Sequence, residues 1–241
     1  MSASHAGFER LLALERGLKS SLRTEQQKAI LSIPSYLDDF KGLPEVIESC
    51  VLRIIDFFKV RSMERKVDMV CQLEKLKSDL DTASCNGDEI SRRLNQLWDI
   101  NDSFLRAQIL RWYRLLHGCC LSGCKIEIWY RIGRSLLADI REEFVEAIET
   151  AIIFASPDFC DGIAYAALSR ICQLPTGSAL GVRLLKALLE NVSRFEEIVM
   201  TYQVTRDIVE KITVDAQHCQ NLTECFQEFR EKHPILNEYN N

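Results

Sequence analysis

The sequence predicts an all-α protein, an α-solenoid of HEAT/ARM-like helical repeats wound into a right-handed superhelix. Glycine and proline are scarce, at 10 and 5 of 241 residues, so long helices with short connections are expected. Apolar residues recur at helical spacing in nearly every segment, and no convincing β alternation is present. A short block of residues also recurs at a fixed distance, which is typical of repeat proteins.

Four helices are expected in the first third of the chain, at residues 5–21, 24–40, 43–60 and 62–81. Pro34 is expected to break the second of these helices, whereas Pro44 is well placed in the first turn of the third. Residues 82–89 are predicted to be a loop because Asn86-Gly87 is a turn signal, and Asp88 is available to cap the helix that follows.

The remainder of the chain is predicted to be a series of helices at residues 90–100, 101–116, 124–140, 141–155, 156–174, 178–192 and 194–212. Asn101 or Asp102 is the expected N-cap of the second, and Ser156 followed by Pro157 marks a helix start. The segment "NDSFLRAQILRWYRLL" is apolar around most of its circumference, which predicts a helix packed against neighbours on several sides.

A repeat with a period of about 40 residues is predicted from the blocks Phe-Leu-Arg-Ala at 104–107, Phe-Val-Glu-Ala at 144–147 and Leu-Leu-Lys-Ala at 184–187. Leu97 and Leu137 keep the same offset in the preceding helices. The alanines Ala107, Ala147 and Ala187 are expected at close helix–helix crossings, and the charged residue before each is expected to reach a neighbouring repeat or to cap its own turn. We expect residues 1–214 to form the solenoid and residues 215–241 a polar tail, with a capping helix as one alternative.

The net charge, the lack of long apolar segments and the cysteine content argue against several functional classes, namely nucleic-acid-binding, secreted and membrane-spanning proteins. The net charge of −5 is opposite to that of a dedicated nucleic-acid-binding domain, although a local basic patch remains compatible with it. The first residues lack the long uncharged core of a secretory signal, and no segment is apolar enough for a membrane span. Ten cysteines without such a signal indicate free thiols in a reducing compartment.

No segment has the pattern of a catalytic or metal site, so we expect no enzyme activity, no cofactor and no bound metal. "HGCCLSGC" brings together His117, Cys119, Cys120 and Cys124, but it has no C-x2-C pair and no matching second half. "HCQNLTEC" would complete a site only by folding back. "LPTGSALG" lacks the lysine of a phosphate loop. Glu142, Glu143, Glu146 and Glu149 are predicted to form a solvated helix face.

The candidate interaction surface is basic and comprises Lys59, Arg61, Arg65, Lys66, Arg111, Arg114, Arg131 and Arg134. Aromatic residues lie nearby in the sequence: Trp112, Tyr113, Trp129 and Tyr130. Arginines interleaved with aromatic residues are able to bind phosphates and stack bases. They serve equally well to bind acidic peptides or to hold repeats together.

The order and spacing of several segments resemble the N-terminal part of the Integrator complex subunit 7 family, over roughly residues 8 to 205. The segments are "LLALERGLKS", "QQKAILSIPSYLDDF", "LPEVIESCVLRIIDFFKV", "NDSFLRAQILRWYRLL" and "GRSLLADIREEFVEAIETAIIFASPDFCDGIA". Each alone is ordinary HEAT-like sequence, so the specificity lies in their order. Family members are several times longer, and the residues after about Val214 do not match the family pattern.

The resemblance implies a non-catalytic scaffold in the nucleus, with the cytoplasm as an additional location. Its partners would be other Integrator subunits and, indirectly, RNA polymerase II, and the complex would support small nuclear RNA 3′-end processing and transcription regulation. No catalytic residue is carried over, because the family motifs contain none. Two alternatives remain: a nucleic-acid-binding solenoid that uses the arginine–aromatic surface, and a HEAT adaptor of another complex.

Overall fold

The computed structural model describes residues 3–36, 48, 52, 55, 86–118, 125–202, 206–217 and 220–234. The regular structure among these residues is helical, and none of them forms a strand, which confirms the all-α prediction. The chain divides into two compact units, Met1–Cys124 and Lys125–Asn241. The predicted helices at 43–60 and 62–81 lie outside the described residues, apart from residues 48, 52 and 55, which are helical.

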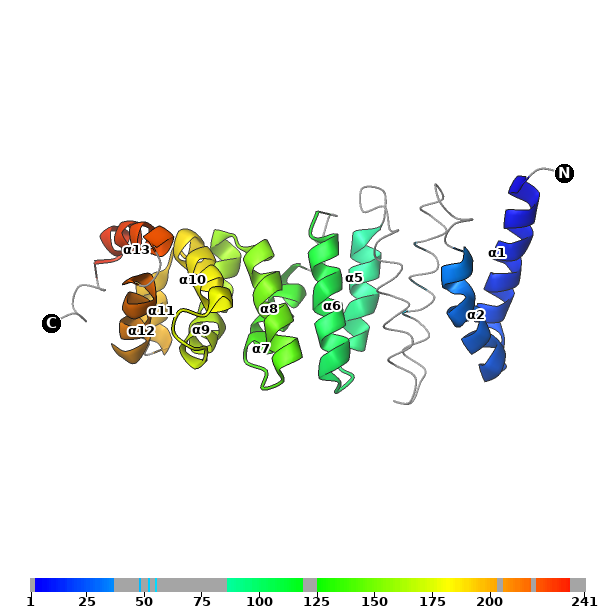
Figure 1. Cartoon of the computed structure of the whole chain (residues 1–241), viewed down its shortest axis with the longest axis horizontal. Helices are drawn as coiled ribbons and strands as arrows, with labels where there is room; N and C mark the ends of the chain where they lie inside the picture. The colour runs from blue at the N-terminus through cyan, green and yellow to red at the C-terminus, as the bar shows by residue number, and fades with distance from the viewer. Residues whose placement is uncertain are drawn as a thin grey trace. The chain divides into compact units, whose positions relative to one another are not determined.

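In the first unit, α1 (Ala3–Lys19) and α2 (Arg23–Tyr36) pack on each other as a helical hairpin (Figure 1). The two helices approach closely at Gly17, where an added Cβ atom would lie 2.8 Å from the Cβ of Ala29. Only glycine therefore fits at this crossing. Pro34 does not break α2 as predicted, because the helix runs on to Tyr36. At this position proline removes one i→i−4 backbone hydrogen bond of α2.

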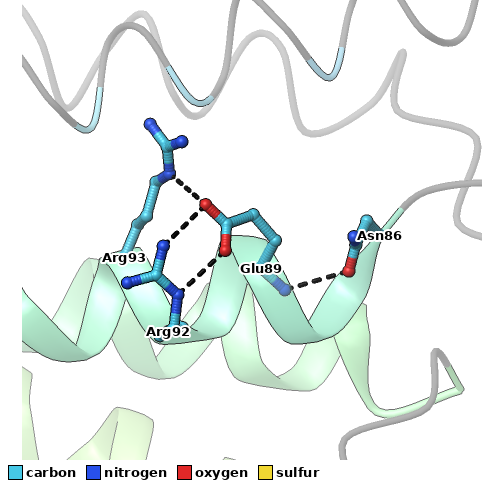
Figure 2. A network of polar contacts seen from close by, with 4 residues as sticks. All are labelled: Asn86, Glu89, Arg92 and Arg93. Atoms are coloured by element: carbon cyan, nitrogen blue, oxygen red, sulfur yellow. Dashed lines mark hydrogen bonds and ion pairs between the residues drawn. The ribbon is translucent and has the colours of Figure 1, made fainter.

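Helix α5 (Gly87–Leu97) begins with a polar cap that Figure 2 shows in detail. The side chain of Asn86, not that of Asp88 as predicted, accepts a hydrogen bond of 3.1 Å from the backbone N–H of Glu89. The Glu89 carboxylate then receives hydrogen bonds from Arg93 at 2.6 Å and from Arg92 at 2.8 Å. These bonds, that from Arg93 first, hold the pKa of Glu89 below its usual value.

Helix α6 (Ser103–Leu116) packs against α5 and is buried at eight positions distributed around its axis. Asp102 is its N-cap, as predicted, and accepts a hydrogen bond of 3.0 Å from the N–H of Leu105. Arg106 donates to the side chain of Asn101 at 2.9 Å, so this charged residue contacts its own turn. The segment is therefore a core helix, as its apolar circumference predicted.

The second unit contains α7 (Lys125–Leu136), α8 (Arg141–Phe154), α9 (Pro157–Gln173), α10 (Ala179–Asn191), α11 (Phe195–Tyr202), α12 (Arg206–Gln217) and α13 (Gln220–Lys232). Alternate helices are neighbours: α7 packs on α9 and α9 on α11, while α8 packs on α10 and α10 on α12 (Figure 1). Helix α13 also packs on α10. Helices consecutive in the chain also pack together, as α7 does on α8 and α9 on α10. Within this unit the helices thus form two rows. The helix start expected at Ser156-Pro157 is confirmed.

Helices α6, α8 and α10 share a register, since their first residues are evenly spaced at positions 103, 141 and 179. Positions buried in all three helices, or at their C-terminal caps, recur at the same spacing. These sets are Leu105/Glu143/Gly181, Ile109/Ala147/Leu185, Trp112/Thr150/Leu188, Tyr113/Ala151/Leu189 and Leu116/Phe154/Val192. A common pattern of burial shows that the three helices use equivalent faces.

The register predicted from the alanine blocks is therefore wrong, because the helices themselves recur at a shorter spacing. Ala107, Ala147 and Ala187 are the fifth, seventh and ninth residues of their helices, so each step slips by two residues. A slip of two residues turns a side chain by about 200° around the helix axis. Ala107 and Ala147 are buried, but Ala187 is only half-buried. Leu97 is 0% exposed whereas Leu137 is 44% exposed, so this pair is not equivalent either.

Buried polar side chains hold together neighbouring helices of the row formed by α7, α9 and α11. The guanidinium of Arg170 on α9 donates hydrogen bonds to the backbone carbonyls of Leu136, the last residue of α7, and of Ala138, two residues later. The carboxylate of Asp161 accepts from the backbone N–H groups of Ser193 and Arg194 at the start of α11, at 2.8 and 3.0 Å. Both residues satisfy backbone groups at helix ends that would otherwise lack partners.

The boundary expected at residue 214 falls inside α12, and the capping helix given as one alternative for the tail corresponds in position to α13. Helix α13 packs on α10 and α12 and buries Leu222, Phe226 and Phe229. The aromatic side chains Phe195, Phe229 and His233 contact one another beneath it. The described residues 215–217 and 220–234 therefore pack into the second unit, although their sequence is polar overall.

Candidate functional site

An apolar groove of about 370 Å³ lies between α7 and α9, and we call it the α7/α9 groove. Its lining comprises Ile126, Trp129, Tyr130, Gly133 and Arg134 from α7 with Leu137 directly after it, and Gly162, Ile163, Tyr165 and Ala166 from α9. The α7 residues recur about every four positions, so they occupy one side of that helix. The opposite side of α7 carries the buried residues Ile128, Ile132 and Leu136. Helix α7 is thus apolar on two faces.

The groove is hollow because each of its helices contributes a glycine. A Cβ atom added to Gly162 would have nothing within 4 Å, and one added to Gly133 would touch only Ile163, at 3.6 Å. Larger side chains rise around them and are unusually accessible: Ile126 is 79%, Tyr130 64% and Tyr165 47% exposed. Large apolar side chains gathered around a hollow are typical of protein interaction sites.

Two cations lie against aromatic rings at this groove. The guanidinium carbon of Arg134 is 5.9 Å from the ring centre of Tyr130, and the ammonium group of Lys125 is 4.7 Å from that of Trp129. Trp129 itself rests edge-on against Phe159 in the core. Within the part of the chain that the structure describes, neither Lys125 nor Arg134 forms an ion pair. The groove therefore combines an apolar floor with a positive rim.

The predicted basic surface is only partly represented in this site. Lys59, Arg61, Arg65 and Lys66 lie outside the described residues. Arg111 and Arg114 are half-buried on α6, which belongs to the first unit. Arg131 is only 8% exposed and is paired with Glu127 one turn before it, so it is not the surface residue that was predicted. Among the described members of the predicted basic surface, Arg134 alone combines exposure with an aromatic neighbour at the groove.

Two of the four predicted stacking residues are also buried. Trp112 and Tyr113 are completely inaccessible, and Tyr113 stacks on Trp98 at 6.2 Å and hydrogen-bonds to Asn95. They pack the core of the first unit and have no face open to a nucleic-acid base. The sequence prediction missed Ile126, Tyr165 and the two glycines. The sequence did contain one signal for the groove: α7 is apolar on two faces, whereas packing against the core requires only one.

The acidic face predicted on α8 is solvated only in part, since Glu142 is exposed whereas Glu146 and Glu149 are half-buried. Glu143 is buried and accepts a hydrogen bond of 2.7 Å from Ser135 on α7. Glu149 forms a two-point ion pair with Arg183 on α10, at 2.8 and 3.1 Å. The carboxylates of Glu143 and Glu149 therefore join α8 to neighbouring helices.

Among the described residues no group of three or more His, Cys, Asp or Glu side chains is placed to hold a metal ion. Cys119, Cys120, Cys124, His218 and Cys219 lie outside them. Cys160, Cys172 and Cys225 are free thiols, and burial raises the pKa of Cys160 to about 11. This thiol is therefore protonated and a poor nucleophile at neutral pH.

None of the described helices is long and apolar enough to span a membrane. No family model matches the chain, and no curated protein matches it either. Among solved structures, the crystal structure of an engineered protein, a structural-genomics target, aligns with a TM-score of 0.57 and 14% sequence identity. The alignment covers 95% of this chain and 97% of that chain. At this identity the likeness concerns the fold alone.

Proposed function

We propose that the chain is a non-catalytic scaffold of the nuclear Integrator complex, built as a right-handed α-solenoid of HEAT-like repeats. The proposal of Integrator rests on the order of segments that resembles subunit 7, from "LLALERGLKS" to "EFVEAIETAIIFASPDFCDGIA". The observation that carries the scaffold role is the α7/α9 groove, an open apolar surface with no catalytic constellation in it. Scaffolds of this kind act by presenting such surfaces to partner proteins.

The solenoid is supported by the common register of α6, α8 and α10 and by the two rows of helices in the second unit. In a solenoid each repeat buries its face only against adjacent repeats. Small-angle X-ray scattering tests this shape. A compact globule of 241 residues has a radius of gyration of about 18 Å. We expect a clearly larger value, and a value near that of the globule would contradict the solenoid.

Affinity purification of the tagged full chain from nuclear extract, followed by mass spectrometry, tests the role in Integrator. We expect other Integrator subunits to co-purify and RNA polymerase II to be recovered through them. Recovery of coat or transport adaptor subunits in their place would favour a HEAT adaptor of another complex.

The nucleic-acid alternative is weakened by the burial of Trp112, Tyr113 and Arg131. Filter binding over a range of salt concentrations separates it from the scaffold role, since phosphate contacts weaken steeply with salt. Submicromolar binding that is lost on charge reversal of Arg111 and Arg114 would favour it.

A further inference from the structure

We infer that the α7/α9 groove binds an amphipathic helix of a partner protein, with large apolar anchors on one side and carboxylates at its margin. This inference rests on the proposed scaffold function and adds the chemistry of the partner. The groove extends from Ile126 to Leu137, about 16 Å along α7, which corresponds to roughly three turns of a bound helix. Its volume of about 370 Å³ has room for one or two large apolar side chains.

The partner is helical because the groove has few groups that could form hydrogen bonds with the backbone of a bound peptide. An extended segment would bury N–H and C=O groups that need hydrogen-bond partners. It usually finds them at the edge of a sheet, and no strand is present in the described part of the chain. The lining supplies few polar groups, chiefly Arg134 and the two tyrosine hydroxyls. A helix satisfies its own backbone, so it is able to lie on this apolar floor.

The partner is acidic because of the charges around the groove. Arg134 is the single charged residue in the lining, and the ammonium group of Lys125, at the start of α7, lies over the ring of the lining residue Trp129. The carboxylates of these two helices are occupied elsewhere or lie at the ends: Glu127 pairs with Arg131, and Asp161 caps α11. Asp158 lies in the first turn of α9, where its negative charge interacts favourably with the dipole of that helix. The surface presented to a partner is therefore apolar and positive.

Two substitutions are designed to block the groove without disturbing the fold. Gly162→Leu places a side chain in the hollow, where an added Cβ meets nothing within 4 Å, and leucine is a better helix former than glycine. Arg134→Glu reverses the charge of an exposed side chain that has no ion pair among the described residues. Thermal unfolding monitored by circular dichroism verifies that both variants remain folded.

Each kind of change has a matched control outside the groove. Tyr165→Gln within the groove is paired with Ile153→Gln on α8, because the two side chains are 47% and 46% exposed. Arg134→Glu is paired with Arg141→Glu, which makes the same change in net charge at an exposed position at the start of α8.

The probe is a library of displayed peptides of about 16 residues, roughly four helical turns, selected on the immobilised full chain. We expect the selected peptides to carry Leu, Phe or Trp at positions i, i+4 and i+7 together with Asp or Glu. Fluorescence anisotropy with the synthetic peptides should show binding at least about tenfold weaker to Gly162→Leu and Arg134→Glu. Binding to Ile153→Gln and Arg141→Glu should equal that of the parent, and added salt should weaken the binding.

Three results would overturn the inference: peptides that bind all variants equally, selected sequences that are basic, or failure to select any peptide. Sedimentation velocity tests a second copy of the chain as the occupant. Self-association of the parent that Gly162→Leu abolishes would assign the groove to that copy and would exclude the partner helix proposed here.

Purification of the parent and Gly162→Leu from nuclear extract separates this inference from the proposed function. Integrator subunits recovered equally with both would leave the scaffold role intact and contradict the role of the groove. Peptides that bind as expected, in a chain that recovers no Integrator subunit, would support the groove and contradict the membership in that complex.

Discussion

Arg170 illustrates how single buried side chains hold this molecule together. It is 6% exposed, yet its guanidinium reaches from α9 to the backbone carbonyl of the last residue of α7 and to another two residues later. The group also lies over the ring of Phe144, 4.2 Å from its centre. Positive charge at a helix C-terminus is favourable, because the free carbonyls there carry partial negative charge. One arginine therefore links three helices of the second unit.

We predict that Arg170→Met lowers the free energy of unfolding by about 2–4 kcal/mol, because it leaves buried carbonyl groups without a hydrogen bond. Arg170→Lys keeps the charge but loses the planar fork that reaches Leu136 and Ala138 together, so its loss should be smaller but measurable. Urea unfolding monitored by circular dichroism provides the comparison. Parent-like unfolding of the methionine variant would contradict this role.

Asp161 makes stability depend on pH. Burial by itself raises the pKa of this carboxyl group, but the hydrogen bonds from Ser193 and Arg194 outweigh that effect and hold the pKa below its usual value. A carboxyl group with a lowered pKa in the folded state contributes stability above the unfolded pKa of about 3.9. That contribution is lost as the pH falls through the folded pKa.

We therefore predict that Asp161→Asn costs about 1–3 kcal/mol at pH 7 and that the difference from the parent narrows at acidic pH. Urea midpoints measured at pH 7 and at about pH 3 test the prediction. Asp158, an exposed residue in the same helix, provides the control through Asp158→Asn, which should change stability little at either pH. An equal loss for Asp161→Asn at both values would show that its charge is not involved.

At the scale of elements, the close approach of helices depends on small residues at particular positions. Gly17 faces Ala29 across the α1/α2 crossing, whereas Gly162 faces the open α7/α9 groove. Both glycines are helical, so both lack the intrinsic helix propensity of alanine. Their surroundings differ, and this difference decides whether replacing the glycine by alanine raises or lowers the stability of the fold.

We predict that Gly162→Ala raises the free energy of unfolding by up to about 1 kcal/mol, since it gains helix propensity without a clash. Gly17→Ala should lower it, because the new methyl group would lie 2.8 Å from the Cβ of Ala29 and the two helices must separate. Thermal melts of the two variants test the pair. An increase in both would mean that α1 and α2 do not cross at Gly17.

Helix α8 provides a second test within one element. Ala147 is fully buried whereas Ile153, on the same helix, is 46% exposed. We predict that Ala147→Trp costs about 1–3 kcal/mol through overpacking, as does Ala107→Trp on α6, and that Ile153→Trp changes stability by less than about 0.5 kcal/mol. Differential scanning calorimetry provides the measurement. Similar melting of Ala147→Trp and Ile153→Trp would show that the register of α8 is incorrect.

Glu149 was predicted to lie on a solvated helix face, but it contacts a neighbouring helix. Its carboxylate is bound at two points by Arg183 of α10, with both side chains partly exposed. Partly exposed ion pairs contribute about 0.2–1 kcal/mol, so Glu149→Ala should cause a small loss of stability and not the neutral outcome expected of a solvated face.

At the scale of the whole molecule, the second unit contains what an independent fold requires. Helices α7 to α13 bury a continuous set of apolar residues, and Arg170, Asp161 and Asp215 satisfy backbone groups within it. We predict that residues 125–241 fold by themselves into a helical unit with a cooperative thermal transition. In this fragment Arg170→Met should cause the same loss as in the full chain. A gradual, non-cooperative melt would show that the first unit is needed.

The sequence by itself determined the helical class and most helix starts, because these depend on neighbours within about four residues. Asp102 and the Ser156-Pro157 pair mark helix starts in the sequence, and the structure confirms both. The apolar circumference of residues 101–116 correctly indicated a core helix. The aromatic and basic character of α7 also indicated Arg134 as part of a surface.

Only the tertiary structure decided which faces of these helices meet. A repeated Leu-Lys-Ala-like block is compatible with many registers, and the burial of Ala107 and Ala147 but not of Ala187 followed from the even spacing of the helix starts at 103, 141 and 179. Whether an arginine is exposed, as Arg134 is, or buried, as Arg131 is, depends on helices distant in the sequence. The groove depends in the same way on two glycines, at positions 133 and 162, that only packing brings together. Helix formation is governed by local interactions, whereas burial is governed by contacts between residues that are far apart in the chain.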